Sequence, residues 1–286
     1  MRFFPFVAFL ALFFVLAACG DDDGGSATRI AGDEAGGDSA ADKTNSIDDV
    51  GLSVKTSSGS STVSIDSVAL AVPCKGDDCE YGTLTDDRDG KTYKTVKIGN
   101  QWWMAENLNF AYLALDMTSD TSNFCYKHEE HYCGTYGRLY QWSAAMDGAG
   151  LFSTNGAGCG YSYRACSPTY PVQGACPTGW HLPTHEEWNV LLAAVGGTDS
   201  AGLMLKSSRD WDDGFGVDAY GFSALPAGSS DNGNYFYDLG VVGIFWTSTE
   251  YYNRFAIYVS LHANSVDAAM LPGIKGDKYS VRCVMD

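Results

Sequence analysis

The sequence predicts an α+β fold that is stapled by disulfides, and three observations lead to this prediction. Two segments have helical patterns and end in glycines, while a larger set of short apolar segments is separated by Gly-, Asn- and Asp-rich loops. Nine cysteines occur in a chain that begins like an exported protein. Two short helices among mostly antiparallel strands are typical of the α+β class.

The first 18 residues have the pattern of a signal peptide. Met1 and Arg2 precede a run of uncharged residues, 3–18, which is shorter than the roughly 20 apolar residues that span a bilayer. Leu16, Ala17 and Ala18 stand directly before Cys19. This sequence resembles the lipobox of bacterial lipoproteins, which implies that Cys19 receives a diacylglyceryl group and becomes the new N-terminus. An ordinary secretory cleavage site next to a chance cysteine is the alternative.

A flexible acidic tether is predicted from residue 19 to residue 61. Residues 20–61 include no aromatic side chain, so they cannot form a core that offsets the loss of chain entropy. Residues 62–81 carry alternating apolar side chains, which predicts either an added strand or an ordered end of the linker. The remaining residues, 82–286, have the length of one folded domain.

The charge of the chain excludes one class of partner. The chain has 35 acidic and 18 basic residues, which give a net charge of −17. Such a chain repels nucleic acids and anionic lipid surfaces, so we expect no nucleic-acid partner. The acidity keeps an exported protein soluble and also attracts divalent cations.

The cysteines predict a disulfide framework. With Cys19 assigned to the lipid, eight remain, which allow 105 connectivities. Six of them form three closely spaced pairs, and the other two are far apart. The candidates are Cys74 with Cys79, Cys125 with Cys133, Cys159 with Cys166, and Cys176 with Cys283. Zinc–thiolate binding is the competing interpretation, but the chain has no Cys-x-x-Cys pair and no zinc-finger spacing.

Local patterns locate the individual elements. A solvated hairpin turn at residues 86–91 leads into a strand at residues 92–98, and a calcium loop is the alternative for its three aspartates. Helices are expected at residues 138–146 and at residues 184–195, where Thr184 and Glu187 form a capping box. His181 and His185 stand at the entry to the second helix as ordinary polar residues. Further strands are expected at residues 221–226, 244–249, 255–261 and 279–284.

Six phrases together resemble the Fibrobacter succinogenes major paralogous domain family. They are GNQWWMAENL at 99–108, GRLY at 137–140, CPTGWHLPT at 176–184, GFSALPAG at 221–228, FWTSTE at 245–250 and SVRCV at 280–284. The resemblance covers residues 82–286, and it implies an exported lipoprotein with a C-type-lectin-like fold. That fold implies a long disulfide to the last strand, which agrees with the pair Cys176–Cys283. Calcium-dependent lectins carry a Trp-Asn-Asp motif, whereas this chain has Trp246-Thr247-Ser248 at the nearest position.

The function expected from these features is a non-enzymatic binding module in the cell envelope. It is anchored to the outer membrane or the cell surface through its lipid, and it recognises a glycan or another cell-surface polymer. Aromatic rings stack on sugar faces, and amides and carboxylates bond to sugar hydroxyls. The candidate residues lie in two loops: Asp231, Asn232, Asn234, Tyr235 and Tyr237 in the first, and Glu250, Tyr252 and Asn253 in the second.

Two other functions remain open, and we expect no cofactor unless the acidic loops bind calcium. The first is an envelope structural role with protein partners. The second is a hydrolase that uses carboxylates such as Glu187 or Glu250, although nothing in the sequence sets two carboxylates at a catalytic separation.

Overall fold

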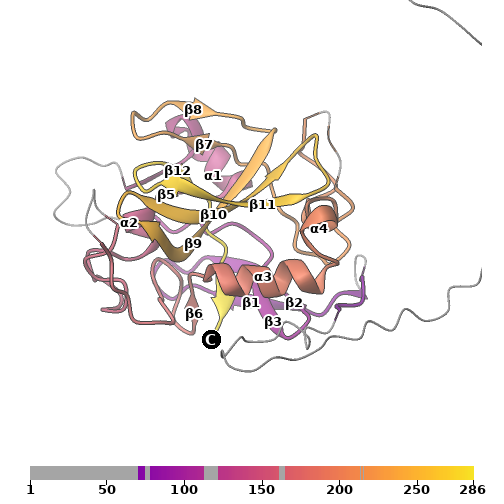
Figure 1. Cartoon of the computed structure of the whole chain (residues 1–286), viewed down its shortest axis with the longest axis horizontal. Helices are drawn as coiled ribbons and strands as arrows, with labels where there is room; N and C mark the ends of the chain where they lie inside the picture. Colours follow the sequence, from indigo (N-terminus) through magenta and orange to yellow (C-terminus); the bar gives the residue numbers. More distant parts are fainter. Residues whose placement is uncertain (1–69, 75–77, 113–121, 161–164, 213, 215) are drawn as a thin grey trace, which may run out of the picture. The chain divides into compact units, whose positions relative to one another are not determined.

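The computed structural model describes residues 70–74, 78–112, 122–160, 165–212, 214 and 216–286 (Figure 1). The predicted signal peptide, Cys19 and the predicted tether lie outside the described residues. Of the predicted strand or linker end at residues 62–81, residues 70–74 are described and have no regular structure. Within the part described, none of the helices combines the length and the apolar character that a membrane crossing needs.

The first sheet brings the two ends of the domain together. Its strand order is β1-β2-β3-β13-β6, and all pairs are antiparallel. The C-terminal strand therefore lies inside this sheet, next to β6 (Figure 1). The strands are β1 (Tyr81–Thr85), β2 (Thr92–Ile98), β3 (Gln101–Met104), β6 (Trp180–His181) and β13 (Val284–Met285).

The turn between β1 and β2 confirms the predicted hairpin and is exposed at Asp87, Asp89 and Gly90, but its first residue, Asp86, is not solvated as expected. Asp86 is fully buried and accepts two hydrogen bonds from the guanidinium of Arg88, at 2.8 and 2.7 Å. The guanidinium lies 3.8 Å from the ring centroid of Phe110 and donates to the carbonyl of Ala175. Pairing with this cation compensates for the burial of the Asp86 carboxylate, since burial of an unpaired charge is unfavourable.

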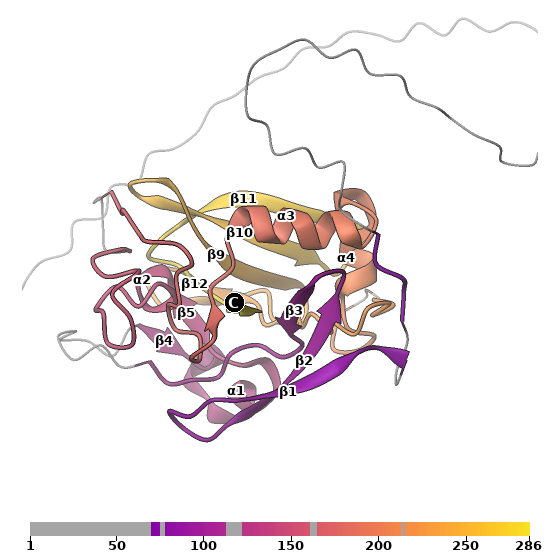
Figure 2. The ribbon, with the colours of Figure 1, turned by 90° about the horizontal axis from the view of Figure 1, so that it is seen from below.

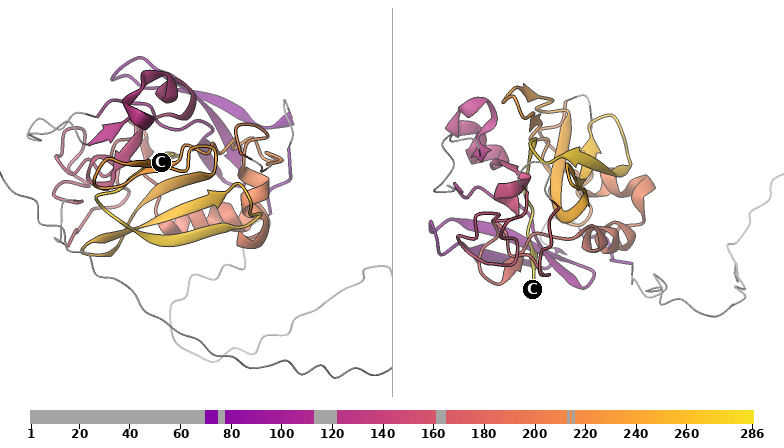
Figure 3. Two further views of the ribbon diagram at one scale, coloured as in Figure 1. Left: turned by 90° about the horizontal axis from the view of Figure 1, so that it is seen from above. Right: turned by 60° about the vertical axis from the view of Figure 1, so that its left-hand side comes forward.

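The second sheet has the order β11-β10-β9, with strands β9 (Val242–Tyr252), β10 (Phe255–His262) and β11 (Ala268–Ile274). The strands predicted at residues 244–249 and 255–261 are confirmed within β9 and β10, and β11 was not predicted. Helices α3 (His185–Ala194) and α4 (Thr198–Leu205) pack against this sheet (Figures 2 and 3).

The third sheet consists of short strands in the order β4-β5-β12-β7-β8. Its central strand β12 pairs with β5 on one side and with β7 on the other. The strands are β4 (Asn123–Phe124), β5 (Leu139–Gln141), β7 (Ser229–Ser230), β8 (Phe236–Tyr237) and β12 (Lys278–Tyr279).

The helices agree with the prediction in one place and differ in others. The capping box of α3 is confirmed: Glu187 N donates to Thr184 Oγ1 at 3.1 Å, and Thr184 N donates to the Glu187 carboxylate at 2.8 Å. The predicted helix at residues 138–146 is wrong over its first half, which is strand β5, and only α2 (Trp142–Ala145) is helical. Helices α1 (Glu130–Tyr136) and α4 and the 3₁₀ turn η3 (Tyr126–His128) were not predicted.

The strand predicted at residues 221–226 is wrong, and the strand predicted at residues 279–284 is interrupted. Residues 221–226 make only an isolated bridge through Ala224, and residues 279–284 divide between β12 and β13. The carbonyls of Phe222 and Ser223 accept hydrogen bonds from a buried arginine, so they do not pair with a strand.

All four expected disulfides are present. Cys74–Cys79, Cys125–Cys133 and Cys159–Cys166 each close a short loop, and Cys176–Cys283 closes a loop with a sequence separation of 107. Chain-entropy models assign the largest stabilisation to the longest loop, about 4–5 kcal/mol against about 2–3 for the short ones. The α+β class and the disulfide framework are thus confirmed.

Arg282 lies in the interior, next to Cys283 of this long disulfide. Its guanidinium is fully buried, and it donates to Asn107 Oδ1 at 2.6 Å and to the carbonyls of Met104, Phe222 and Ser223 at 3.0, 2.5 and 2.8 Å. Burial lowers the pKa of Arg282 to about 9, although Asp218 and Glu106 oppose the shift. The residue is therefore still charged at neutral pH.

His181 links the C-terminus of the chain to helix α3. Its Nε2 lies 2.7 Å from the Glu187 carboxylate, and its Nδ1 lies 2.7 Å from the Asp286 carboxylate. Burial alone would lower the pKa of His181, but the hydrogen bonds and charges of Glu187 and Asp286 together raise it. Burial alone would raise the pKa of Glu187, but hydrogen bonds from His181 and Thr184 lower it.

Replacement of Arg282 by Ala is expected to lower the free energy of unfolding by at least about 3 kcal/mol, because buried oxygens lose their donor at about 1–3 kcal/mol each. Arg282→Lys should give a smaller loss, since a single ammonium cannot reach all four acceptors. Urea denaturation measures both. The exposed Arg209→Ala is the control, and an Arg282→Ala variant as stable as this control would contradict the assigned role.

The His181 contacts predict a pH-dependent stability. The raised pKa of His181 means that its contribution is complete below about pH 6.5 and is lost as pH rises through the folded-state value. The lowered pKa of Glu187 means that its contribution is complete above about pH 4.5 and is lost in stronger acid. His181→Gln should therefore destabilise the protein more at pH 6 than at pH 9. An equal loss of melting temperature at the two pH values would contradict this.

Candidate functional site

The two loops predicted to bind a ligand both contact one short turn, residues 275–277, between β11 and β12. Asn232 N donates to the Asp277 carboxylate at 3.1 Å, and Lys275 N donates to the carbonyl of Arg254 at 3.0 Å. The β7–β8 hairpin and the β9–β10 hairpin are thus brought to the same turn from sequence positions about twenty residues apart. We call the exposed and partly exposed side chains of residues 229–238, 250–254 and 275–277 the tyrosine surface.

Asp231 organises the β7–β8 hairpin. Its carboxylate accepts hydrogen bonds from Tyr235 N at 2.9 Å and from the Tyr237 hydroxyl at 3.2 Å. The bond from Tyr235 N is the main cause that lowers the pKa of Asp231, so this carboxylate is ionised at neutral pH. Asn234 has φ 64°, a left-handed conformation that Asn tolerates better than most residues. The loop is therefore held in one shape by its own side chains.

Phe236 also anchors the hairpin, because its ring packs against two neighbouring aromatic rings. Its ring lies 5.1 Å from the ring of Tyr126 and 6.4 Å from that of Phe124. Because side chains alternate along a strand, Tyr235 and Tyr237 point away from this contact and are 68 % and 45 % exposed.

Lys278 joins the hairpin to the turn. Its buried ammonium donates to the carbonyl of Asp231 at 3.0 Å and to that of Gly276 at 3.4 Å. Burial lowers the pKa of Lys278, while Asp277 and Asp231 oppose the shift. Burial raises the pKa of Asp277, and Tyr279 and Asn232 partly offset this by donating to its carboxylate. The sequence did not point to these residues, because their role depends on a contact across 47 positions.

Glu250 in the second loop is held by the protein itself. Its carboxylate pairs with the buried ammonium of Lys275 and accepts from Cys166 N at 3.1 and 3.2 Å. Glu187, the other carboxylate considered for catalysis, is held by Thr184 and His181. Both carboxylates thus make ion pairs and hydrogen bonds within the fold.

Tyr251 and Tyr252 are the exposed aromatics of the second loop, at 64 % and 65 %. Tyr252 pairs with Phe255 and Glu250 pairs with Ala256, so Tyr251 is an extra residue in a β-bulge. The bulge breaks the alternation of the strand and leaves two successive tyrosines exposed. Tyr251 was not among the predicted ligand residues, because nothing in the local sequence indicates the bulge. Asn253, which was among them, is half-buried.

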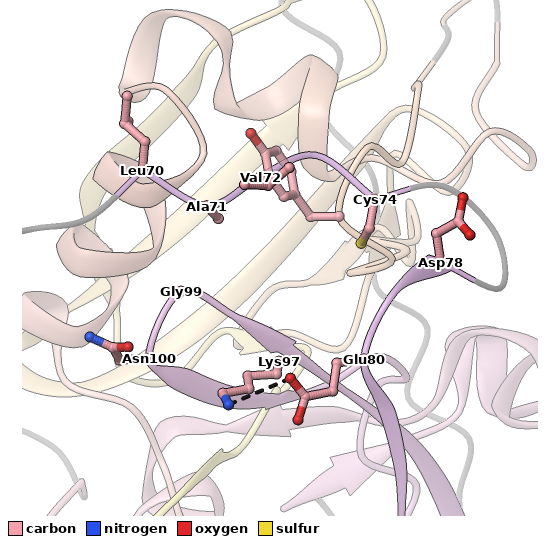
Figure 4. A pocket seen from close by; sticks show the side chains of 10 residues that line it. Leu70, Ala71, Val72, Cys74, Asp78, Glu80, Lys97, Gly99 and Asn100 are labelled. Atoms are coloured by element: carbon pink, nitrogen blue, oxygen red, sulfur yellow. Dashed lines mark ion pairs between the residues drawn. The ribbon is translucent and has the colours of Figure 1, made fainter.

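A separate pocket of about 370 Å³ lies where the chain enters the domain (Figure 4). It is lined by apolar and polar side chains, and Lys97 and Glu80 form an ion pair of 3.5 Å at its edge. None of the predicted ligand residues lies in it. The other lining residues are Leu70, Ala71, Val72, Cys74, Asp78, Gly99, Asn100 and Tyr220.

Metal ligation has little support among the described residues. One group there combines Cys125, Cys133 and Glu130 within 4.8 Å, but the two cysteines are joined in a disulfide. In the β1–β2 turn, Asp86 pairs with Arg88 and Asp89 pairs with Lys91. Trp246, Thr247 and Ser248, at the position of the lectin motif, are all fully buried.

The comparisons with known proteins agree with the resemblance seen in the sequence. The profile of the Fibrobacter succinogenes major domain family matches residues 96–285, from within β2 to the end of β13. No curated protein and no solved structure matches the chain. The C-type-lectin-like architecture therefore stays a prediction. Because the matched region includes about two thirds of the sequence, the chain belongs to the Fibrobacter succinogenes major domain family.

Proposed function

We propose that the protein is a lipid-anchored binding module of the cell envelope, without catalytic activity, that recognises a glycan or cell-surface polymer through the tyrosine surface. The observation that carries the proposal is the set of exposed tyrosines on two rigid loops, Tyr235 and Tyr237 on one and Tyr251 and Tyr252 on the other. Large apolar side chains are seldom left exposed in a group without an interaction partner.

The surroundings of these rings suit a sugar polymer. Each tyrosine offers an aromatic face for stacking and a hydroxyl for hydrogen bonding. Asp231, Asn232 and Asp277 lie beside the first pair and offer acceptors and donors for sugar hydroxyls. Since the loops are braced by Phe236 and Lys278, little conformational entropy is lost on binding.

The cysteines and the N-terminus support a location outside the cytoplasm. Four disulfides are typical of proteins that fold in an oxidising environment outside the cytoplasm. The apolar leader and Cys19 favour export followed by lipid attachment. Acyl chains on Cys19 would hold the domain at the outer membrane or cell surface, since more than one chain gives stable anchoring.

Anchoring through Cys19 predicts that Cys19→Ala removes the protein from the membrane fraction, because no thiol remains to accept the lipid. Labelled palmitate should enter the natural chain and not the variant. Cys19→Ala protein that still carries the label and sediments with membranes would contradict the anchor.

Stacking predicts that Tyr235→Ala weakens binding to a responsive polymer about tenfold, since a buried interface ring contributes more than about 1 kcal/mol. The measurement is a polysaccharide array, with and without calcium, on the oxidised chain, followed by titration of the polymers that bind. Tyr235→Phe keeps the ring and should bind nearly as well, and Val190→Ala on α3 is a distant control.

Unchanged affinity in Tyr235→Ala would contradict the assigned surface. A blank array together with recovery of an envelope protein in a pull-down would favour the alternative structural role with protein partners.

A further inference from the structure

The tyrosine surface combines carboxylates that are partly or fully exposed with lysines whose side chains are buried beneath it. Asp231 and Asp277 flank the turn, and Asp238 is exposed at the end of β8. Lys275 and Lys278 are 3 % and 1 % exposed, and their ammonium groups are occupied by Glu250 and by backbone carbonyls.

Arg254 is the exposed cationic residue of these two loops and the turn. A ligand that reaches this surface therefore meets more negative than positive charge. The whole chain has the same bias, with 35 acidic and 18 basic residues, so the long-range field does not reverse the local one.

We propose that the polymer bound by the tyrosine surface is an uncharged polysaccharide, and that the carboxylates at the turn exclude polymers carrying uronate, sulfate or phosphate groups. This inference rests on the proposed glycan-binding function and specifies its ligand class. Neutral sugars carry hydroxyl donors that satisfy the carboxylate oxygens, whereas an anionic sugar places like charges side by side.

The carboxylates have free acceptor capacity for such hydroxyls. The Asp231 carboxylate accepts from Tyr235 N, from the Tyr237 hydroxyl and from the backbone of Gly233. Each oxygen of Asp277 accepts one hydrogen bond, from Asn232 N and from the Tyr279 hydroxyl. An ionised carboxylate has about four lone-pair sites, so each group can accept further hydrogen bonds. The internal donors also hold the oxygens in place, which makes the acceptors preorganised.

The expected size of the discrimination follows from the Coulomb energy. Two like charges 4 Å apart in water repel by an amount that equals about a fivefold change in affinity. The repulsion is screened at high ionic strength, since the Debye length falls to about 3 Å in 1 M salt. A discrimination caused by these carboxylates must therefore shrink as salt is added.

The test uses the full chain with oxidised disulfides, in detergent, against dextran, xylan and galactomannan, each paired with its carboxymethylated derivative. The matched pairs share a backbone and differ in charge. We expect at least one neutral polymer to bind about fivefold more tightly than its carboxymethylated partner at low salt, and the difference to narrow at high salt.

The variants Asp231→Asn and Asp277→Asn connect this discrimination to the turn. Asn keeps an oxygen that can accept from Tyr235 N or Asn232 N. Its amide NH2 group replaces the oxygen that accepts from the Tyr237 or Tyr279 hydroxyl and can donate to that hydroxyl instead, so the charge is removed while both partners keep a hydrogen bond. Each variant should raise the relative affinity for the carboxymethylated polymer several-fold. Asp87→Asn, in the exposed part of the β1–β2 turn, is the matched control and should leave the ratio unchanged.

Three outcomes overturn the proposal in distinguishable ways. Tighter binding of a carboxymethylated polymer would overturn the ligand class and leave glycan binding by this surface intact. Discrimination that Asp231→Asn and Asp277→Asn do not change would overturn the role of these carboxylates. Absence of binding to both members of every pair, combined with a blank array, would overturn the ligand class and the proposed function together.

Discussion

The guanidinium of Arg282 lies in the fully buried interior, where its hydrogen bonds reach the end of β3, Asn107 and the loop at residues 222–223. Asn107 extends the network, since its amide donates to the carbonyl of Tyr136, the last residue of α1. A single cation thus satisfies backbone oxygens at the end of β3 and in the loop at residues 222–223. The adjacent residue, Cys283, is disulfide-bonded to Cys176, so the same stretch of chain is fixed twice.

Buried lysines use the same principle in the loops. Lys206 donates to three carbonyls between residues 262 and 265, which shapes the connection from β10 to β11. Lys278 holds the β7–β8 hairpin to the neighbouring turn, and Lys275 pairs with Glu250. Burial of an ammonium is unfavourable unless several oxygens receive its protons, so each lysine selects one loop conformation. Long irregular loops are ordered in this way by buried cations.

The exposed tyrosines depend on this framework. Tyr235 and Tyr237 face outward because Phe236 between them is packed on Tyr126, and the bulge at Tyr251 turns the end of β9. Rings that are held on rigid loops lose little freedom when a ligand binds, which favours a recognition role over a packing role. On the proposed function, the charge pattern around them would distinguish between neutral and anionic ligands.

Local patterns in the sequence were sufficient to predict the three short disulfide loops, the α+β class, the hairpin before β2, and α3 with its capping box, because those features depend on neighbouring residues or on close cysteine spacing. The long disulfide Cys176–Cys283 was predicted as the remaining pair, in agreement with the family resemblance. The candidate loops were also identified from composition. Only the tertiary structure decided that residues 139–141 form a strand with β12, that residues 221–226 do not form one, and that Glu250 serves Lys275. The physical reason is that a strand edge, a buried cation and an ion pair each need a partner far away in the sequence, and composition does not say which residues will meet.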